Sequence, residues 1–414
     1  MTSAVSPASR RQVVIFALLT AACVAGDAML YVVLPVHWRE AGLDSLWEVG
    51  VVLSLNRLAR LPLNPVMGWV YSRANTKTCA VAAAVLSLLI PLGYACASSL
   101  AAWAALRVLW GTAWSLLKLG GLFTVMAAAG KSDRGYLVGV YTGTYRLGNL
   151  AGMLAGALLA DLSGLHAAFF ASAVMAAPAL PLALFFLHGV PPSARKAKEP
   201  DKSRPSLLSL LRTPGLFWVL LTCLAVTLII EGFFMSTLSA LMAHHWGGVL
   251  HLSGLAVGCA TMAGMIQSLR WGWDPVLSPL VGRFSDGRLG RTGMFAAGAW
   301  TASALLALTA LPLPLVPWLA VLVGMELCCT VMTTLSDALA TDVATRTQPV
   351  FVITAYTLAM DLGAALGPTG GFFIISLWGM ETAYVLAALL LAFFALRWSF
   401  RPPLKGPDKH ARPC

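Results

Sequence analysis

The sequence predicts an all-α membrane protein with twelve transmembrane helices in two pseudo-symmetric six-helix bundles. Of its 414 residues, 58% are hydrophobic and only 11% are charged, whereas soluble domains have roughly 45–50% apolar and about 25% charged residues. Apolar segments of the roughly 20 residues that a helix needs to cross a bilayer recur along the whole chain. A polar, proline-containing segment at residues 189–214 separates six of these segments from the other six.

The predicted spans use most of the chain and leave short loops between them. They lie near residues 13–36, 47–71, 78–98, 101–129, 136–160, 166–188, 215–241, 254–281, 294–312, 315–340, 351–377 and 380–398. We therefore expect an N-terminal bundle in residues 1–188, a cytosolic linker at 189–214, a C-terminal bundle in residues 215–398 and a cytosolic tail at 399–414. The first apolar run follows two arginines, as a signal peptide does, but it continues to Trp38 and further spans follow it, so we interpret it as a transmembrane helix.

The positions of the basic residues predict the orientation. The net charge is +11, and the Lys and Arg residues outside the spans lie almost entirely in the termini, the linker and the loops on the same side. The loops on the other side contain only Arg39. Because cytosolic loops are enriched in Lys and Arg, we expect both termini in the cytosol and the protein in the cytoplasmic (inner) membrane. This distribution also argues against a nucleic-acid partner.

No pattern in the sequence indicates an enzyme, a metal centre or a cofactor site. The eight cysteines lie mostly within apolar runs and lack the regular spacing of a disulfide framework or a zinc site. Glycine-rich phosphate loops and the short motifs of serine or zinc hydrolases are missing, which excludes an ATP-driven pump. A receptor or enzyme without transport activity remains an alternative of a different class.

The two halves contain matching segments. Residues 141–156 contain Tyr-Thr, then Leu-Gly and two more glycines at four-residue spacing, and residues 356–371 repeat this pattern. Residues 64–68 match residues 278–282 at almost the same separation. Such matches indicate a duplicated six-helix unit, the architecture of parallel-repeat transporters, in which the substrate path runs between the halves.

Residues 282–291, Gly-Arg-Phe-Ser-Asp-Gly-Arg-Leu-Gly-Arg, resemble the cytosolic loop motif of the major facilitator superfamily. The equivalent segment of the first half, residues 68–77, has Ser72 where the family has aspartate. In such loops the acid caps a helix end or pairs with a basic group across the interface of the halves. The resemblance covers nearly the whole chain and implies a gating role for Gly68, Arg73, Gly282, Asp286 and Arg291.

Two further motifs resemble the twelve-segment, proton-coupled drug and metabolite antiporters of that family. Arg107 matches the arginine of the Arg-x-x-Gln-Gly pattern that the family associates with proton coupling, although Trp110 replaces the glutamine. Gly367 and Pro368 resemble the family's Gly-Pro bend, but they lie in span eleven rather than span five, and their expected role is gating. Span five has glycines at four-residue spacing and no proline, a pattern that is also typical of close helix packing.

Ionisable residues within the spans are candidates for function, because a charge at the bilayer centre costs about 2.5–3.5 kcal/mol even on lenient scales. Asp27 in span one and Glu231 in span seven place one carboxylate in the first helix of each half. A carboxylate at such a site can bind and release a proton as water access alternates. Asp27 is the first candidate for proton coupling, with Glu231 second and Arg107 associated; the alternative for Asp27 is a structural pairing with a nearby arginine.

The substrate-binding candidates are polar and aromatic residues that share helix faces by their spacing. In the N-terminal half they are Arg57, Arg60, Asn64, Trp110, Trp114, Lys118 and Arg146. In the C-terminal half they are Glu326, Thr330, Asp337 and Asp361. Packing or an interfacial belt is the alternative for the tryptophans. Arg146 and Asp361 occupy equivalent positions of the two repeats, so we expect them to form a salt bridge in one conformation.

These charges predict the substrate class. The spans of the N-terminal half hold mostly basic residues and those of the C-terminal half mostly acidic ones, which favours a small anionic or zwitterionic amphiphile such as a drug, a metabolite or a siderophore-like chelator. We expect proton-coupled export by a monomer without a cofactor, its partners being the substrate, protons and membrane lipid. The alternative is proton-coupled uptake of an anionic nutrient or siderophore by symport.

Overall fold

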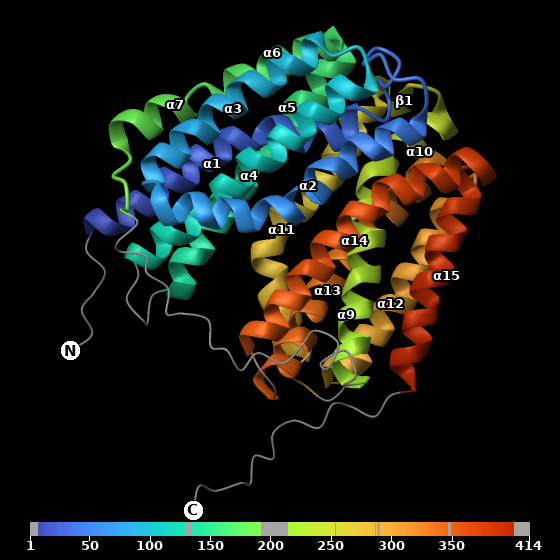
Figure 1. Cartoon of the computed structure of the whole chain (residues 1–414). Helices are drawn as coiled ribbons and strands as arrows, with labels where there is room; N and C mark the ends of the chain where they lie inside the picture. The colour runs from blue at the N-terminus through green and yellow to red at the C-terminus, as the bar shows by residue number, and fades with distance from the viewer. Residues whose placement is uncertain are drawn as a thin grey trace, which may run out of the picture. The chain divides into compact units, whose positions relative to one another are not determined.

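The computed structural model describes residues 7–128, 134–191, 214–252, 254–285, 287, 290–346 and 349–400, which are almost entirely helical (Figure 1). Up to residue 191, the helices are α1 (Pro7–Val33), α2 (Leu46–Arg73), α3 (Thr76–Cys96), α4 (Leu100–Ala128), α5 (Arg134–Ser163), α6 (Leu165–Ala176), α7 (Ala179–Pro181) and the π-helix η1 (Leu182–Phe186). From residue 214 onward they are α9 (Pro214–Thr227), the π-helix η3 (Leu228–Phe234), α10 (Met235–Trp246), α11 (Cys259–Ser285), α12 (Gly290–Thr309), α13 (Leu315–Arg346), α14 (Pro349–Trp378) and α15 (Met380–Ser399).

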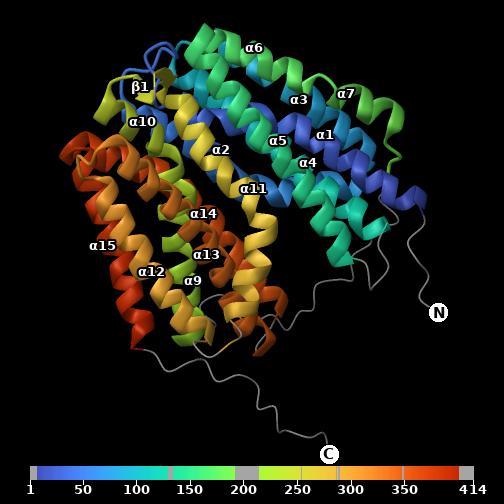
Figure 2. The ribbon, with the colours of Figure 1, turned by 180° about the vertical axis from the view of Figure 1, so that it is seen from behind.

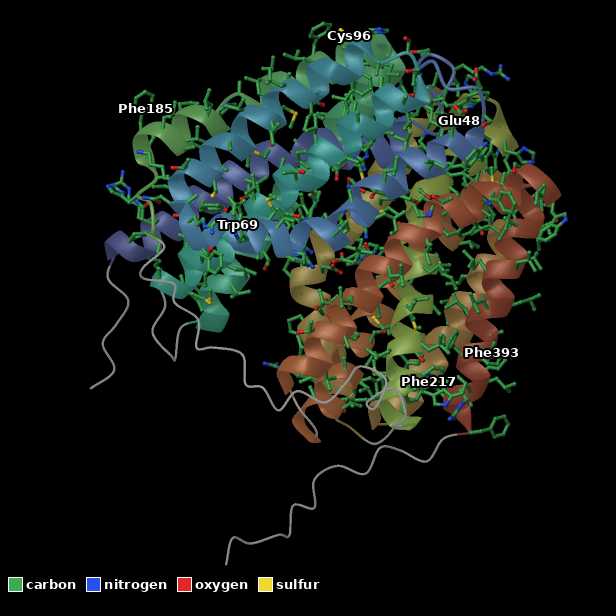
Figure 3. All side chains as sticks on the ribbon, in the orientation of Figure 1. Glu48, Trp69, Cys96, Phe185, Phe217 and Phe393 are labelled. Carbon is green, nitrogen blue, oxygen red and sulfur yellow. The ribbon has the colours of Figure 1, made fainter. Side chains whose placement is uncertain are left out.

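Helix length and composition identify the chain as a membrane protein. Among the described residues, nine helical segments are long and apolar enough to cross a membrane. Three more helices, α2, α5 and α11, have 28, 30 and 27 residues but do not meet the same measure. Large apolar side chains lie on the surface, and Figure 3 shows Phe185 and Phe393, which are 76% and 50% exposed, pointing away from the helices. A surface this rich in apolar side chains is typical of lipid contact.

By their contacts, the described residues divide into two compact units. The first unit falls within residues 1–204, 233–271 and 365–373, and the second within 205–232, 272–364 and 374–414. The domain boundaries expected from the sequence depend on the linker, most of which lies outside the described residues, so they stay a prediction.

Close packing of α5 against α1 organises the first unit, and the two helices run side by side in Figures 1 and 2. The glycines of α5 face α1 at one-turn intervals: Gly148 lies against the backbone of Ala21, and Gly152 lies against that of Ala25. Neither position has room for a Cβ atom. The four-residue glycine spacing therefore serves helix packing, because only glycine lets two backbones approach this closely.

The second unit repeats this contact. Gly363 of α14, the sequence counterpart of Gly148, lies against Leu224 and Thr227 of α9 without room for a Cβ atom. Hydrogen bonds add to the packing, since Trp398 Nε1 donates to Thr222 Oγ1 (2.9 Å) and Ser303 Oγ donates to the Ala388 carbonyl (2.7 Å). The first and fifth helical segments of both sequence repeats thus meet through an equivalent glycine.

A β-hairpin precedes α11 and shifts its start from the predicted position. Strands β1 (Val249–Leu252) and β2 (Leu255–Gly258) pair antiparallel, with Val249 opposite Gly258. The predicted span began at residue 254, but Gly254 has a φ of +87°, in the left-handed region that favours glycine, so the chain turns there. The helix then begins at Cys259.

Candidate functional site

An ion pair between Asp27 and Arg107 joins α1 to α4. The Arg107 side chain is fully buried (0% exposed), and its Nη1 donates to Asp27 Oδ1, whose side chain is 21% exposed. Arg107 Nε also donates to the Val52 carbonyl of α2 at 3.0 Å. The guanidinium therefore holds three helices together. Of the two charged groups, the carboxylate alone is partly exposed.

Two tyrosines complete an ion-pair cluster around these groups. Arg57 Nε donates to the Tyr31 hydroxyl (3.3 Å), and its guanidinium lies 5.8 Å from the centre of that ring. Tyr94 of α3 is buried, stacks on Trp103 with ring centroids 4.7 Å apart and lies beside Arg107. The cluster thus draws on α1, α2, α3 and α4, and the sequence did not indicate its two tyrosines.

A second group, which we name the aromatic-basic cluster, consists of Arg60, Trp114, Tyr145, Arg146 and Trp271. The Trp114 and Tyr145 rings meet edge to face with centroids 5.5 Å apart, and Arg60 and Arg146 both act electrostatically on Tyr145. The Arg146 guanidinium lies 5.5 Å from the Trp271 ring centre, a distance suited to a cation–π contact. The three rings are partly exposed, Arg146 is exposed and Arg60 is buried. Cationic groups and aromatic faces therefore occur together in one unit.

The remaining candidates of the N-terminal half differ in their surroundings. Asn64 Oδ1 accepts a hydrogen bond from Ser115 Oγ at 3.0 Å, which links α2 to α4. Trp110 is only 4% exposed, so packing accounts for it, whereas Lys118 is exposed. Of the three candidates on α4, one tryptophan is thus buried and the lysine is exposed.

In the second unit, a buried carboxylate meets the predicted polar face of α13. Thr330 Oγ1 donates to Asp274 Oδ1 (2.6 Å) and accepts from Trp273 Nε1 (3.1 Å). Asp274, Thr330 and Glu326 are all buried, with 7%, 0% and 3% exposure. Asp274 and Trp273 were not predicted as site residues.

The other acidic candidates are more accessible. Asp337 is exposed and accepts from the Tyr356 hydroxyl at 2.6 Å, while Asp361 is partly exposed. Glu231, also partly exposed, lies within the π-helix η3. Such π-helical turns occur frequently at functional sites.

The two arginines among the gating candidates make contacts within their own units. Arg291 Nη1 donates to Asp342 Oδ1 and to the Ala338 carbonyl (3.3 Å), tying α12 to α13. The Arg73 guanidinium lies 4.0 Å from the Trp69 ring centre. A Cβ atom at Gly68 or Gly282 would meet nothing within 4 Å, so packing against a neighbour does not explain either glycine. Asp286 lies outside the described residues.

The Gly367-Pro368 segment of α14 lies against α2. A Cβ atom at Gly50 would meet the Pro368 carbonyl oxygen at 2.6 Å, so glycine permits the approach. The Thr369 hydroxyl lies 2.8 Å from Ser54 Oγ and 3.2 Å from the Gly50 carbonyl, and its backbone N–H donates to Ser54 Oγ at 3.2 Å. These bonds pin the segment to α2.

We expect Thr369→Val to lower the free energy of unfolding by about 1 kcal/mol, the scale measured for hydrogen bonds between membrane helices. Thermal unfolding in mild detergent, followed by circular dichroism, measures the change. Thr357→Val is the matched control on the same helix, because among the described residues the Thr357 hydroxyl bonds only its own helix, at Ile353. Equal effects of the two substitutions would show that the contact with α2 adds no stability.

Within the described residues, no group of three or more His, Cys, Asp or Glu side chains could hold a metal ion.

Comparison with known proteins shows what this chain and its fold are similar to. The family model described as Major Facilitator Superfamily matches residues 16–273 and 275–413. The fold is similar to a structure of the nucleoside transporter NupG, with a TM-score of 0.77, 13% identity and coverage of 95% of this chain and 100% of that one. It is also similar to a POT family transporter in complex with 5-aminolevulinic acid, with a TM-score of 0.72, 14% identity and coverage of 93% and 94%. No curated protein matches the chain at a significant level.

Proposed function

We propose that this protein exports a small anionic or zwitterionic amphiphile in exchange for protons. The proposal starts from the family, because this chain belongs to the Major Facilitator Superfamily and is a membrane transporter. The observation that carries the proposal is the pairing of a partly exposed carboxylate, Asp27, with a fully buried guanidinium, Arg107. In the same unit the aromatic-basic cluster offers charge and aromatic surface to such a molecule. The helical segments α1 to α15 would cross the membrane twelve times, with α2, α5 and α11 as the three less apolar spans.

Asp27 is the group that we propose to carry the proton. Protonation removes its negative charge and with it the attraction to Arg107, while the bond from Arg107 to the Val52 carbonyl holds the guanidinium in place. Proton binding thus loosens the ionic link from α1 to the Arg107 side chain, which bridges α4 and α2, and proton release restores the pair. This links the occupancy of one site to the packing of three helices, as alternating access requires. Glu231 is the second candidate, in the equivalent helix of the other half.

The aromatic-basic cluster is the proposed substrate site of the first unit. Arg60 and Arg146 would bind an anionic group, and the Trp114, Tyr145 and Trp271 rings would cover an apolar part. Arg57, Asn64 and Lys118 extend the polar face along α2 and α4. Trp110 is buried, and we assign it to packing.

Acidic residues of the second unit would receive a cationic group of the substrate. Asp274 and Glu326 are buried near Thr330, and Asp337 is exposed on the same helix as Glu326. By sequence, Asp361 is the repeat counterpart of Arg146. Opposite charges at equivalent positions favour a zwitterion over a simple lipophilic cation.

The proposed orientation follows from the basic loops: both termini lie in the cytosol, and the protein is embedded in the cytoplasmic (inner) membrane. We propose that it acts there as a monomer. In this orientation Gly68, Arg73, Gly282, Asp286 and Arg291 lie at the cytosolic side, where we propose that they gate the inner opening. Gly367 and Pro368, seated on α2, would act at the other side.

Inside-out vesicles test the proposal. When the vesicle lumen is acidic, an exporter of this kind lets protons leave the lumen for the medium and carries its substrate from the medium into the lumen. A panel of radiolabelled dipolar and anionic amphiphiles should therefore reveal the substrates by their accumulation. A symporter would instead lose lumenal solute under the same gradient, which would favour the uptake alternative. Arg146→Gln should weaken accumulation, whereas Arg39→Gln, in the loop after α1, should not. Accumulation unaffected by Arg146→Gln would contradict its place in the substrate site.

A further inference from the structure

A histidine in the loop after α1 bridges two carboxylates that belong to neither cluster described above. His37 Nδ1 lies 3.0 Å from Glu40 Oε1, and His37 Nε2 lies 3.3 Å from Asp161 Oδ1. The side chains of His37 and Asp161 are 14% and 10% exposed. Ionised carboxylates only accept hydrogen bonds, so the ring satisfies both partners only when both of its nitrogens carry hydrogen. The geometry is therefore that of an imidazolium.

Both carboxylates continue this link to the ends of neighbouring helices. Asp161 Oδ2 accepts from the Thr261 backbone N–H (2.7 Å) and from Thr261 Oγ1 (2.6 Å), in the first turn of α11. Glu40 Oε2 accepts from the Leu165 N–H at 3.2 Å, where α6 begins. A carboxylate at a helix N-terminus is favoured by the helix dipole. One protonated ring thus connects the loop after α1 with α5, α6 and α11.

The chain around the start of α11 approaches α5 closely at two points. Gly258 lies so near Asp161 that it has no room for a Cβ atom. Farther along, Gly264 of α11 packs tightly on α5, where an added Cβ atom would lie 3.3 Å from both Ala157 Cβ and the Met153 carbonyl oxygen. Separation of the two helices at this end therefore requires that the bonds from Asp161 to Thr261 break.

We propose that His37, Glu40, Asp161 and Thr261 form a proton-binding latch that fastens the start of α11 to the end of α5. The latch closes when His37 binds a proton and weakens when His37 loses it. The role of this latch in transport rests on the proposed function and on its orientation, which places the loop after α1 at the outer side. Acid outside the cell would then hold the outer side closed, independently of the proton on Asp27.

The electrostatics give the sign of the pH dependence. Burial alone would lower the pKa of His37, but the hydrogen bonds with Asp161 and Glu40 outweigh it and raise the pKa above its ordinary value. The latch is therefore complete below the ordinary pKa of histidine and is lost as the pH rises through the raised pKa.

The other charged groups around the latch determine the lowest pH at which it stays closed. Burial alone would raise the pKa of Glu40, but hydrogen bonds from His37 and from the Leu165 N–H, with the charge of His166 on α6, hold it below its ordinary value. The latch is therefore lost again when the pH falls through the pKa of Glu40. Cys259 of α11 also lies near Asp161, and the Arg39 guanidinium stacks over the Trp38 ring, 4.9 Å from its centre.

Hydrogen exchange of the full-length protein in lipid nanodiscs tests the latch without any substrate. The probe is the protection of the backbone amides of residues 259–266, corrected for intrinsic exchange rates, between about pH 5 and pH 8, the range in which histidine titrates. In the wild type we expect protection to fall several-fold as the pH rises. His37→Gln should lower protection several-fold at acidic pH and remove its pH dependence, and Asp161→Asn should lower protection throughout.

His188→Gln is the matched control, because this exposed histidine lies after η1 and belongs to none of the latch contacts in the described part of the chain. It should behave as the wild type does, and peptides of α13 serve as an internal reference for folding in every variant. Protection that keeps its pH dependence in His37→Gln, or that is flat in the wild type, would overturn the proposal. Because the assay measures no transport, failure of the transport experiment would leave this result intact.

Discussion

Arg107→Met should destabilise the protein by about 3–5 kcal/mol and abolish transport driven by a proton gradient. Arg107 is fully buried and pairs with the partly exposed Asp27, so the substitution removes a buried guanidinium and leaves that carboxylate without its ionic partner. The lost bond to the Val52 carbonyl adds to the effect. Thermal unfolding in detergent and flux in inside-out vesicles measure the two consequences.

A double substitution separates pairing from packing. Arg107→Met combined with Asp27→Asn removes both charges, so it should regain most of the stability that Arg107→Met loses, while transport stays lost. Arg39→Met is the control, because that arginine is exposed and stacks on its neighbour Trp38 in the loop after α1. Additive losses in the double variant would show that the two charges do not stabilise each other.

Gly148→Leu should prevent α5 from packing on α1 and lower the free energy of unfolding by about 3 kcal/mol or more, the upper range for overpacked interiors. The added side chain would meet the Ala21 backbone, which cannot move aside as a side chain could. Gly363→Leu should have a comparable effect through Leu224 and Thr227 in the second unit.

Gly143→Leu is the matched control for this series. Gly143 lies on α5, as Gly148 does, and a Cβ atom there would meet nothing within 4 Å. The two variants therefore share the change in helix propensity, but only Gly148→Leu adds a clash. Fluorescence-detected size-exclusion chromatography, followed by thermal unfolding of the purified variants, compares the three. A folded Gly148→Leu variant as stable as Gly143→Leu would contradict the close approach of α1 and α5.

The fold class could be predicted from the sequence because apolar segments of sufficient length are its strongest signal. The predicted fifth span, 136–160, falls within α5 (Arg134–Ser163). The prediction was less accurate where backbone geometry rather than hydropathy decides. The start of α11 follows a hairpin, whereas the sixth predicted span, 166–188, matches the helical segment Leu165–Phe186 despite Pro178. Hydropathy averages over such turns and does not register them.

The candidate site could be predicted only in part, because spacing along one helix indicates a face but not its neighbour. Asp27 and Arg107 are 80 residues apart; Asp27 was predicted as an ionisable residue within a span and Arg107 from a family motif, but the sequence did not indicate which arginine Asp27 pairs with. The aromatic members Tyr145 and Trp271 carry no charge, so a search for ionisable residues in spans passed over them. His37 and Asp161, 124 residues apart, lie just beyond the ends of predicted spans, so a search for ionisable residues within the spans did not include them.

The release of protons on substrate binding tests the central claim most directly. Purified full-length protein in weakly buffered nanodiscs, with a pH indicator, receives each amphiphile that the vesicle assay identifies, and tryptophan fluorescence reports binding. The account predicts proton release on binding by the wild type and by Asp44→Asn, an exposed loop residue, and none by Asp27→Asn although the substrate still binds. Undiminished proton release by Asp27→Asn would contradict it.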